Sequence, residues 1–75
     1  MNPIDFALRG DHITLDALLK ATGLSESGGS AKALIASAAV RVNGEVETRR
    51  GRKLRGGEVV QVGPDRVKVR LPPAD

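Results

Sequence analysis

The stretch VRVNGEVE at residues 40–47 contains the clearest folding signal in this 75-residue chain. Its first three residues alternate valine, arginine and valine, as in a strand with one buried face. Asn43-Gly44 follows, and this pair is the strongest short-range indicator of a β-hairpin because both residues tolerate a positive φ. We therefore predict a hairpin whose second strand covers residues 45–47.

Three further strands are predicted outward from this hairpin. Residues 4–8 alternate large apolar side chains with smaller or polar ones, and residues 58–62 form a valine-rich run after a Gly-Gly pair. Residues 67–71 alternate apolar with basic side chains, which predicts a last strand with one apolar and one basic face. A Gly-Pro-Asp turn at residues 63–65 separates the last two strands.

Two amphipathic helices are predicted between the first strand and the hairpin. The first covers residues 15–22, with Thr14 as its N-cap and Gly23 as its stop. The second follows a loop at residues 25–29 and ends near Ala38, and the short connector predicts a helical hairpin. The apolar faces of these helices comprise Leu15, Leu18 and Leu19 in the first and Ala31, Leu34, Ile35 and Ala38 in the second.

This order of elements predicts an α+β fold, with a helical hairpin packed on a small antiparallel sheet. Residues 1–75 should form one domain, since the leucine, valine, isoleucine and phenylalanine side chains are enough for one modest core. No run approaches the roughly 18 to 20 apolar residues of a membrane span, and the N-terminus does not resemble a signal peptide. The chain has no cysteine, and therefore no disulfide and no thiolate metal site. Taken together, these features predict a soluble, cytoplasmic protein, which we also expect to be a monomer.

The sequence shows no arrangement typical of an enzyme. His12 is the only imidazole, the carboxylates do not have the spacing of metal ligands, and the Gly-Lys-Ser/Thr order of a P-loop is absent. A Ser-His-Asp set built on His12 with Asp11 or Asp16 stays open but is disfavoured, because a lone histidine near a helix start is usually a surface residue. We predict no catalytic residue, no metal site, no cofactor and no small-molecule substrate.

Positive charge is concentrated in the middle of the chain. The net charge is +3, yet residues 1–30 are acidic on balance and residues 41–55 are strongly basic. Such asymmetry is typical of a protein that binds a polyanion, although a solubilising surface has the same pattern. Guanidinium groups suit phosphate because they donate two parallel hydrogen bonds. The predicted phosphate-binding cations are Arg41, Arg49, Arg50, Arg52, Lys53 and Arg55.

The start of the second helix is another candidate phosphate site. Ser27 and the glycines after it open a helix whose first N–H groups have no partners within the helix, and Lys32 adds a charge one turn further on. Simple capping by Ser25 or Ser27 would explain the same residues. Phe6 is the only aromatic residue and lies in a core-like run, so bases cannot stack on an aromatic surface. We therefore predict binding of structured RNA through phosphates and shape.

These residues resemble the RNA-binding domain of ribosomal small-subunit protein four, the S-four domain. The resemblance is carried by LDALL at residues 15–19, by Ser27-x-x-x-Ala31-Lys32 with Ile35, and by VRVNG at residues 40–44. The extra N-terminal strand and VETRRGRK at residues 46–53 are similar to the short stand-alone bacterial members, the YbcJ-type proteins.

The resemblance implies the alpha-L motif, with structured RNA, commonly ribosomal RNA, as the partner. The RNA contacts that it implies are Ser27, Lys32, Arg41, Arg49, Arg50, Arg52 and Lys53. Thr14 and Gly28 stand where the family usually has arginine, so two cations of the family's binding face are missing here. We therefore expect residues 49–55 to supply more of the RNA contacts. Ala38 stands where a glycine usually ends the second helix, which implies a strained or altered helix end.

Two other functions remain open at this stage. The first is a protein-interaction module whose basic segment docks an acidic partner, and the second is a DNA-binding protein. The RNA interpretation requires that the basic residues after the hairpin converge with the start of the second helix on one positive face.

Overall fold

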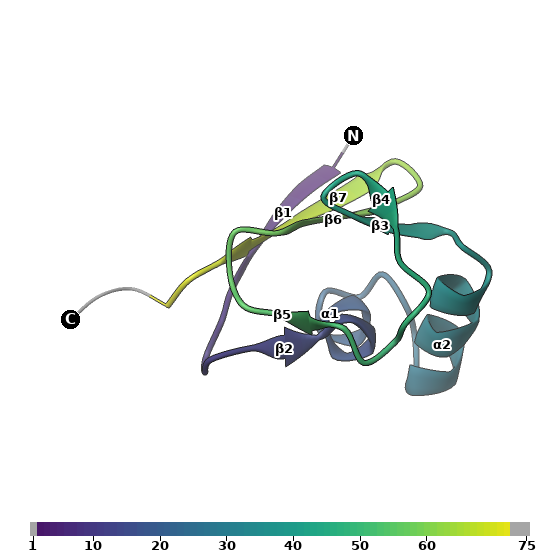
Figure 1. Cartoon of the computed structure of the whole chain (residues 1–75), viewed down its shortest axis with the longest axis horizontal. Coiled ribbons are helices and arrows are strands. Elements are labelled where there is room, and N and C mark those ends of the chain that lie inside the picture. The colour runs from purple at the N-terminus through teal and green to yellow at the C-terminus, as the bar shows by residue number, and fades with distance from the viewer. Residues whose placement is uncertain (1, 73–75) are drawn as a thin grey trace.

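The structure, a computed structural model, describes residues 2–72. A five-stranded sheet forms one layer, and two helices and a short two-stranded ribbon lie on one side of it (Figure 1). In the order β1-β7-β6-β3-β4, the sheet contains β1 (Asn2–Ala7), β7 (Asp65–Arg70), β6 (Val59–Val62), β3 (Val40–Val42) and β4 (Glu45–Val46). The ribbon pairs β2 (Ile13–Thr14) with β5 (Lys53–Leu54), and the helices are α1 (Leu15–Ala21) and α2 (Gly28–Ala36). The predicted α+β class and helical hairpin are confirmed.

The β3–β4 hairpin forms where it was predicted. Asn43 and Gly44 have φ values of 53° and 84°, as a type I′ turn requires at both central positions. Asn43 also ties the turn to β6, because its N–H donates to the Val59 carbonyl (2.8 Å) and its Oδ1 accepts from the Val59 N–H (2.9 Å). Val40 and Val42 are buried while Arg41 is exposed, so the alternation in the sequence separates a core face from an outer face.

The sheet departs from the antiparallel expectation at one edge. Strands β7, β6, β3 and β4 pair antiparallel, whereas β1 pairs with β7 in parallel, with Ile4 opposite Val67 and Phe6 opposite Val69. Parallel neighbours need a long crossover connection, and here the rest of the domain, including both helices, lies between β1 and β7 in the chain.

The core fills the space between the inner face of the sheet and the two helices. The predicted apolar faces of both helices and of the last strand are mostly confirmed, and Phe6 packs against this core as expected. Ala38 and Leu71 are the exceptions: both are exposed, because each lies beyond the end of its element. The buried apolar residues are Leu8, Leu15, Leu18, Leu19, Ala31, Ile35, Val40, Val42, Leu54, Val60, Val67 and Val69.

The N-terminal end of α1 differs in detail from the prediction, whereas its C-terminal end agrees with it. Thr14 occupies the N-cap position, but its hydroxyl donates to Asp16 Oδ1 (2.7 Å) and does not accept a backbone N–H of the helix. At the other end Gly23 has a φ of 78°, so this glycine ends the helix as predicted.

The ends of α2 also differ from expectation. The helix begins at Gly28 rather than after the Gly-Gly pair, and the Ser27 hydroxyl caps it by accepting the Ser30 N–H (3.2 Å). It ends at Ala36, and Ala38 then adopts a φ of 64°. A side chain with a Cβ is strained in this left-handed conformation, which confirms the altered helix end implied by the missing glycine.

Candidate nucleic-acid interface

Residues 47–55, which we call the basic segment, follow β4 and include the strand β5 of the ribbon. Backbone hydrogen bonds hold this segment to the rest of the domain at several points. Near its start the Glu47 N–H donates to the Val40 carbonyl (3.0 Å). In its middle the carbonyls of Arg50 and Arg52 accept the first N–H groups of α1, at 3.1 and 2.9 Å. These carbonyls satisfy donors that Thr14 leaves unpaired.

The segment includes β5, a strand that was not predicted from the sequence. Lys53 pairs with Thr14 and Leu54 pairs with Ile13, and the Leu54 side chain is fully buried. The only sequence signal for this strand is one leucine among cations, which is too short for any periodicity. Leu54 thus joins the core, whereas Arg49, Arg50, Lys53 and Arg55 around it are exposed and Arg52 is half-buried.

Glu47 organises the first part of the basic segment. Its side chain is only 8% exposed, and its carboxylate accepts the Arg49 backbone N–H (3.1 Å), Arg49 Nε (3.1 Å), Arg49 Nη2 (3.2 Å) and Arg52 Nη1 (3.0 Å). Hydrogen bonds from the side chains of Arg49 and then Arg52 lower the pKa of Glu47 to about 2, against the opposing effect of burial. One buried carboxylate therefore orients two guanidinium groups.

The remaining cations of the segment face solvent. Arg50, Lys53 and Arg55 are exposed, and their side chains form no ion pair within residues 2–72. Arg49 stays 76% exposed despite its bond to Glu47, and the Arg52 side chain stays 34% exposed. A hollow of about 430 Å³ lies among these cations, lined by Arg49, Gly51, Arg52 and Lys53.

A second carboxylate shapes the turn after β5 through backbone hydrogen bonds, while the charge of the Arg55 side chain helps, after the hydrogen bond and charge of His12, to lower the pKa of Asp11. Glu58 accepts the backbone N–H groups of Arg55 (2.9 Å) and Gly56 (2.8 Å). Burial raises the pKa of Glu58, but these backbone hydrogen bonds outweigh it, so the pKa lies below its usual value.

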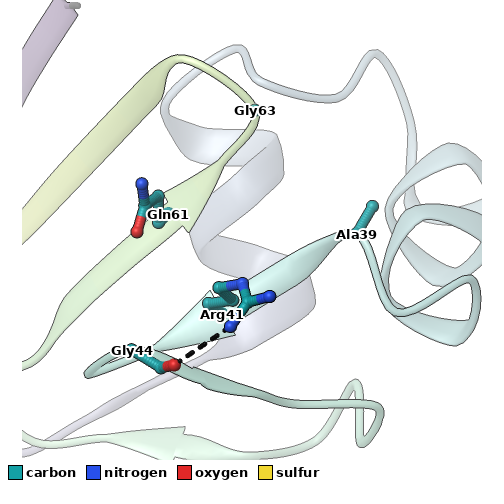
Figure 2. A pocket seen from close by; sticks show the side chains of 5 residues that line it. All are labelled: Ala39, Arg41, Gly44, Gln61 and Gly63. Atoms are coloured by element: carbon teal, nitrogen blue, oxygen red, sulfur yellow. Dashed lines mark hydrogen bonds between the residues drawn. The ribbon is translucent and has the colours of Figure 1, made fainter.

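Arg41 lies apart from the other predicted cations. Its neighbours Val40 and Val42 face the core, so Arg41 points from the opposite face of the sheet, away from the helices (Figure 2). It stands beside Gln61 of β6, and its Nη1 donates to the Gly44 carbonyl (3.2 Å). The expectation that Arg41 shares one positive face with the cations of residues 49–55 is therefore wrong.

Ser27 and Lys32 are on the helix side of the sheet, as are the basic segment and β5 (Figure 1). Lys32 is exposed on α2, and the Ser27 oxygen is engaged in capping. Within residues 2–72, no hydrogen bond or ion pair joins either side chain to residues 47–55. The capping explanation for Ser27 is confirmed, while a phosphate contact there stays a prediction.

The groups considered for catalysis lie on the surface. His12 Nδ1 is 2.7 Å from Asp11 Oδ1, and no serine of residues 2–72 hydrogen-bonds to this pair. In the same part of the chain, no cluster of three or more histidine, aspartate or glutamate side chains could hold a metal ion. The helices described also include none of sufficient length and apolarity to cross a membrane.

Comparison with known proteins agrees with the resemblance seen in the sequence. A family model described as the S4 domain matches residues 6–70. The chain belongs to the S4 domain family. The S4 domain is the S-four domain named above, so this expectation is confirmed.

Individual S4 relatives match most of the chain. YbcJ of Escherichia coli (strain K12), provisionally named an RNA-binding protein, is 45% identical over 58 residues, which cover 77% of this chain and 83% of YbcJ. RlbA of Bacillus subtilis (strain 168), provisionally named a ribosome maturation protein, is 43% identical over 61 residues, covering 81% of this chain and 83% of RlbA.

A solved structure extends the similarity to the fold. The solution structure of E. coli YbcJ matches with a TM-score of 0.71 and 41% identity, covering 93% of this chain and 90% of that chain. That structure is described as revealing an alpha-L motif involved in RNA binding. The predicted alpha-L fold class is thereby confirmed.

Within this S4 domain, Glu47 is the site residue that sequence reasoning missed. Its sequence signal is weak, because a carboxylate in a run of arginines is usually a solvated neighbour. A glutamate two residues before one arginine and five before another, at a strand end, could have indicated a shared salt bridge.

Proposed function

We propose that this S4-domain protein binds structured RNA without catalysing a reaction, and that residues 49–55 contact its phosphates. The main support for the proposal is the arrangement around Glu47, which holds Arg49 and Arg52 beside the exposed side chains of Arg50 and Lys53, two cations that form no ion pair within residues 2–72. The S4 family, and the RNA-binding description of YbcJ, support RNA as the ligand.

Preorganisation makes this cluster suited to phosphate. Arg49 uses Nε and Nη2 on Glu47, so its other guanidinium N–H group remains free to donate to a ligand. A guanidinium that is already oriented loses less side-chain entropy on binding than a free one. The hollow lined by Gly51 lets a phosphate approach without meeting a side chain at that position.

Phosphates and RNA shape, rather than base stacking, should supply the recognition. Phe6, the single aromatic residue, is packed against the core, so it offers no platform for bases. Helical RNA is recognised largely through its shape and its backbone, which suits a cluster of arginines. Ser27 and Lys32 are included as secondary contacts, because the capping hydroxyl of Ser27 still has its O–H to donate.

Ribosomal RNA in the cytoplasm is the specific ligand that we propose. The name of RlbA, a ribosome maturation protein, supports this choice. A DNA-binding protein would prefer duplex DNA to RNA, and a module that docks an acidic protein would prefer an acidic polypeptide. Duplex DNA and poly-glutamate are therefore tested beside RNA.

The test measures binding of a labelled RNA hairpin by fluorescence anisotropy over a range of salt concentrations. If about four cations meet phosphates, log K should fall with log salt at a slope near −3. Arg50→Gln/Lys53→Gln should flatten the slope by about 1.5 and weaken binding about tenfold at low salt. These two cations are chosen because removing them leaves the buried Glu47 with both its partners.

The matched control is Arg9→Gln/Lys20→Gln, which removes the same charge from exposed positions outside the basic segment. Equal slopes for the two double variants would contradict the assignment of residues 49–55. Tighter binding of duplex DNA of equal length, or of poly-glutamate, would contradict RNA as the ligand.

A further inference from the structure

The outer face of the five-stranded sheet carries a second group of cations. Arg41 on β3 stands opposite Gln61 on β6, and Gln61 stands opposite Arg66 on β7, so these three side chains form a row across the sheet. Lys68 extends the group along β7. We call Arg41, Gln61, Arg66 and Lys68 the outer-sheet surface.

Among the described residues, the cations of this surface form no ion pair of their own, and the acid that borders them is Asp5 on β1, which is opposite Lys68 in the strand register. Arg41, Arg66 and Lys68 form no ion pair within residues 2–72. The next cation along β7, Arg70, differs because its Nε lies 3.0 Å from Asp5 Oδ1 on β1. The outer-sheet surface is therefore a patch of three cations, bordered at β1 by Asp5, whose carboxylate pairs with Arg70.

The spacing of the cations follows from the strand geometry. Arg41 and Arg66 lie two strand spacings apart, about 10 Å, and Arg66 and Lys68 are about 7 Å apart along one strand. These separations suit neighbouring phosphates of a nucleic-acid chain, and the Gln61 amide can donate between them. A hollow of about 430 Å³ borders the row, lined by Ala39, Arg41, Gly44, Gln61 and Gly63 (Figure 2).

The composition of this surface favours RNA over a protein partner. Protein interfaces concentrate their binding energy in aromatic and arginine side chains set in desolvated pockets, and lysine is depleted there. The apolar residue most exposed near the row is Val46, which is opposite Arg41 and 46% exposed. Charge without an apolar anchor is characteristic of a phosphate-contacting surface.

We infer that the outer-sheet surface binds the phosphates of a second RNA segment, so that one chain is held between two parts of a folded RNA. This inference rests on the proposed function, since it takes RNA as the ligand. The basic segment is on the helix side of the sheet and the outer-sheet surface faces away from the helices, so the two groups of cations are placed to contact different RNA segments. The domain would thus join two RNA elements rather than cap one.

The test asks whether one chain binds two RNA hairpins. Native mass spectrometry of the full chain with an excess of a short RNA hairpin should show a complex of one chain with two hairpins. Arg41→Gln/Arg66→Gln should retain the first hairpin and weaken the second at least tenfold. Arg9→Gln/Lys20→Gln removes the same charge and should behave as the unaltered chain. In parallel, NMR titration should shift the backbone amides of Gln61 and Lys68 in the unaltered chain.

The outcomes separate this inference from the proposed function. Undiminished two-hairpin complexes with Arg41→Gln/Arg66→Gln, or unmoved sheet amides during RNA binding, would overturn the inference and leave the basic segment as the single RNA site. Absence of any RNA binding by the unaltered chain would overturn both. Shifts of the sheet amides with poly-glutamate and not with RNA would assign the surface to an acidic protein and overturn the inference.

Discussion

Replacing the buried carboxylate of Glu47 should destabilise the fold in a pH-dependent way. In Glu47→Gln the side chain keeps its size but loses the charge that holds Arg49 and Arg52. The pKa of Glu47 is lowered from 4.5 to about 2 in the folded chain, which corresponds to an upper value of about 3 kcal/mol at neutral pH. The Arg49 side chain is 76% exposed, so solvent weakens the pair, and we expect a loss of about 1–2 kcal/mol.

The sign of the pH dependence follows from the lowered pKa. The carboxylate contributes its full stabilisation above the pKa of the unfolded chain, near 4.5, and loses it as the pH falls through the folded value of about 2. The difference in unfolding free energy between the unaltered chain and Glu47→Gln should therefore shrink by roughly half or more between pH 7 and pH 3.

Urea unfolding followed by circular dichroism at both pH values measures this difference in free energy. In a separate thermal melt at pH 7, the melting temperature of Glu47→Gln should lie about 5–15 °C below that of the unaltered chain. Glu45→Gln is the matched control, because Glu45 is exposed on β4 and forms no ion pair within residues 2–72, so its effect should stay within about 0.5 kcal/mol. A destabilisation by Glu47→Gln that is equal at pH 7 and pH 3 would refute the reasoning.

Two backbone predictions test the turns of the fold by thermal melting. Ala38→Gly should raise the stability by about 1 kcal/mol, because Ala38 has a φ of 64° that glycine adopts without strain; a lower melting temperature would contradict this. Gly56→Ala should cost about 1–3 kcal/mol, since its φ is 118° and a Cβ there would lie 2.5 Å from Leu71 Cδ2. Gly51→Ala is the control, with nothing within 4 Å of its Cβ, and an equal loss in both variants would reject the explanation.

The parts of the fold with strong local patterns were predictable from the sequence. Asn43-Gly44 specifies its turn because positive φ is required at both positions, and the leucines of α1 mark its buried face by their spacing. The parallel position of β1 was not predictable in this way, because it depends on which edge of the sheet is free once the other strands have paired. A strand of two residues such as β5 leaves no periodicity to detect.

The candidate site was predictable in its chemistry and less so in its geometry. Charge asymmetry identifies residues 41–55 as the basic region, but the distribution of those cations over two faces depends on the path of the chain after β4. Arg41 is fixed outward by its buried strand neighbours, whereas Arg52 is turned toward Glu47 inside the loop. Burial of Glu47 is likewise a tertiary effect, since a charged run by itself indicates exposure.

The first turn of α1 depends on the basic segment for its hydrogen-bond acceptors, because the carbonyls of Arg50 and Arg52 accept its first N–H groups. Lifting that segment away would leave the N–H groups of Leu15 and Asp16 without these acceptors. We therefore expect a ligand that immobilises these arginines to stabilise the first turn of α1 as well. The backbone amides of Leu15 and Asp16 donate the two hydrogen bonds that join the helix to the segment. The rate at which these amides exchange with solvent deuterium therefore measures how firmly the segment is held.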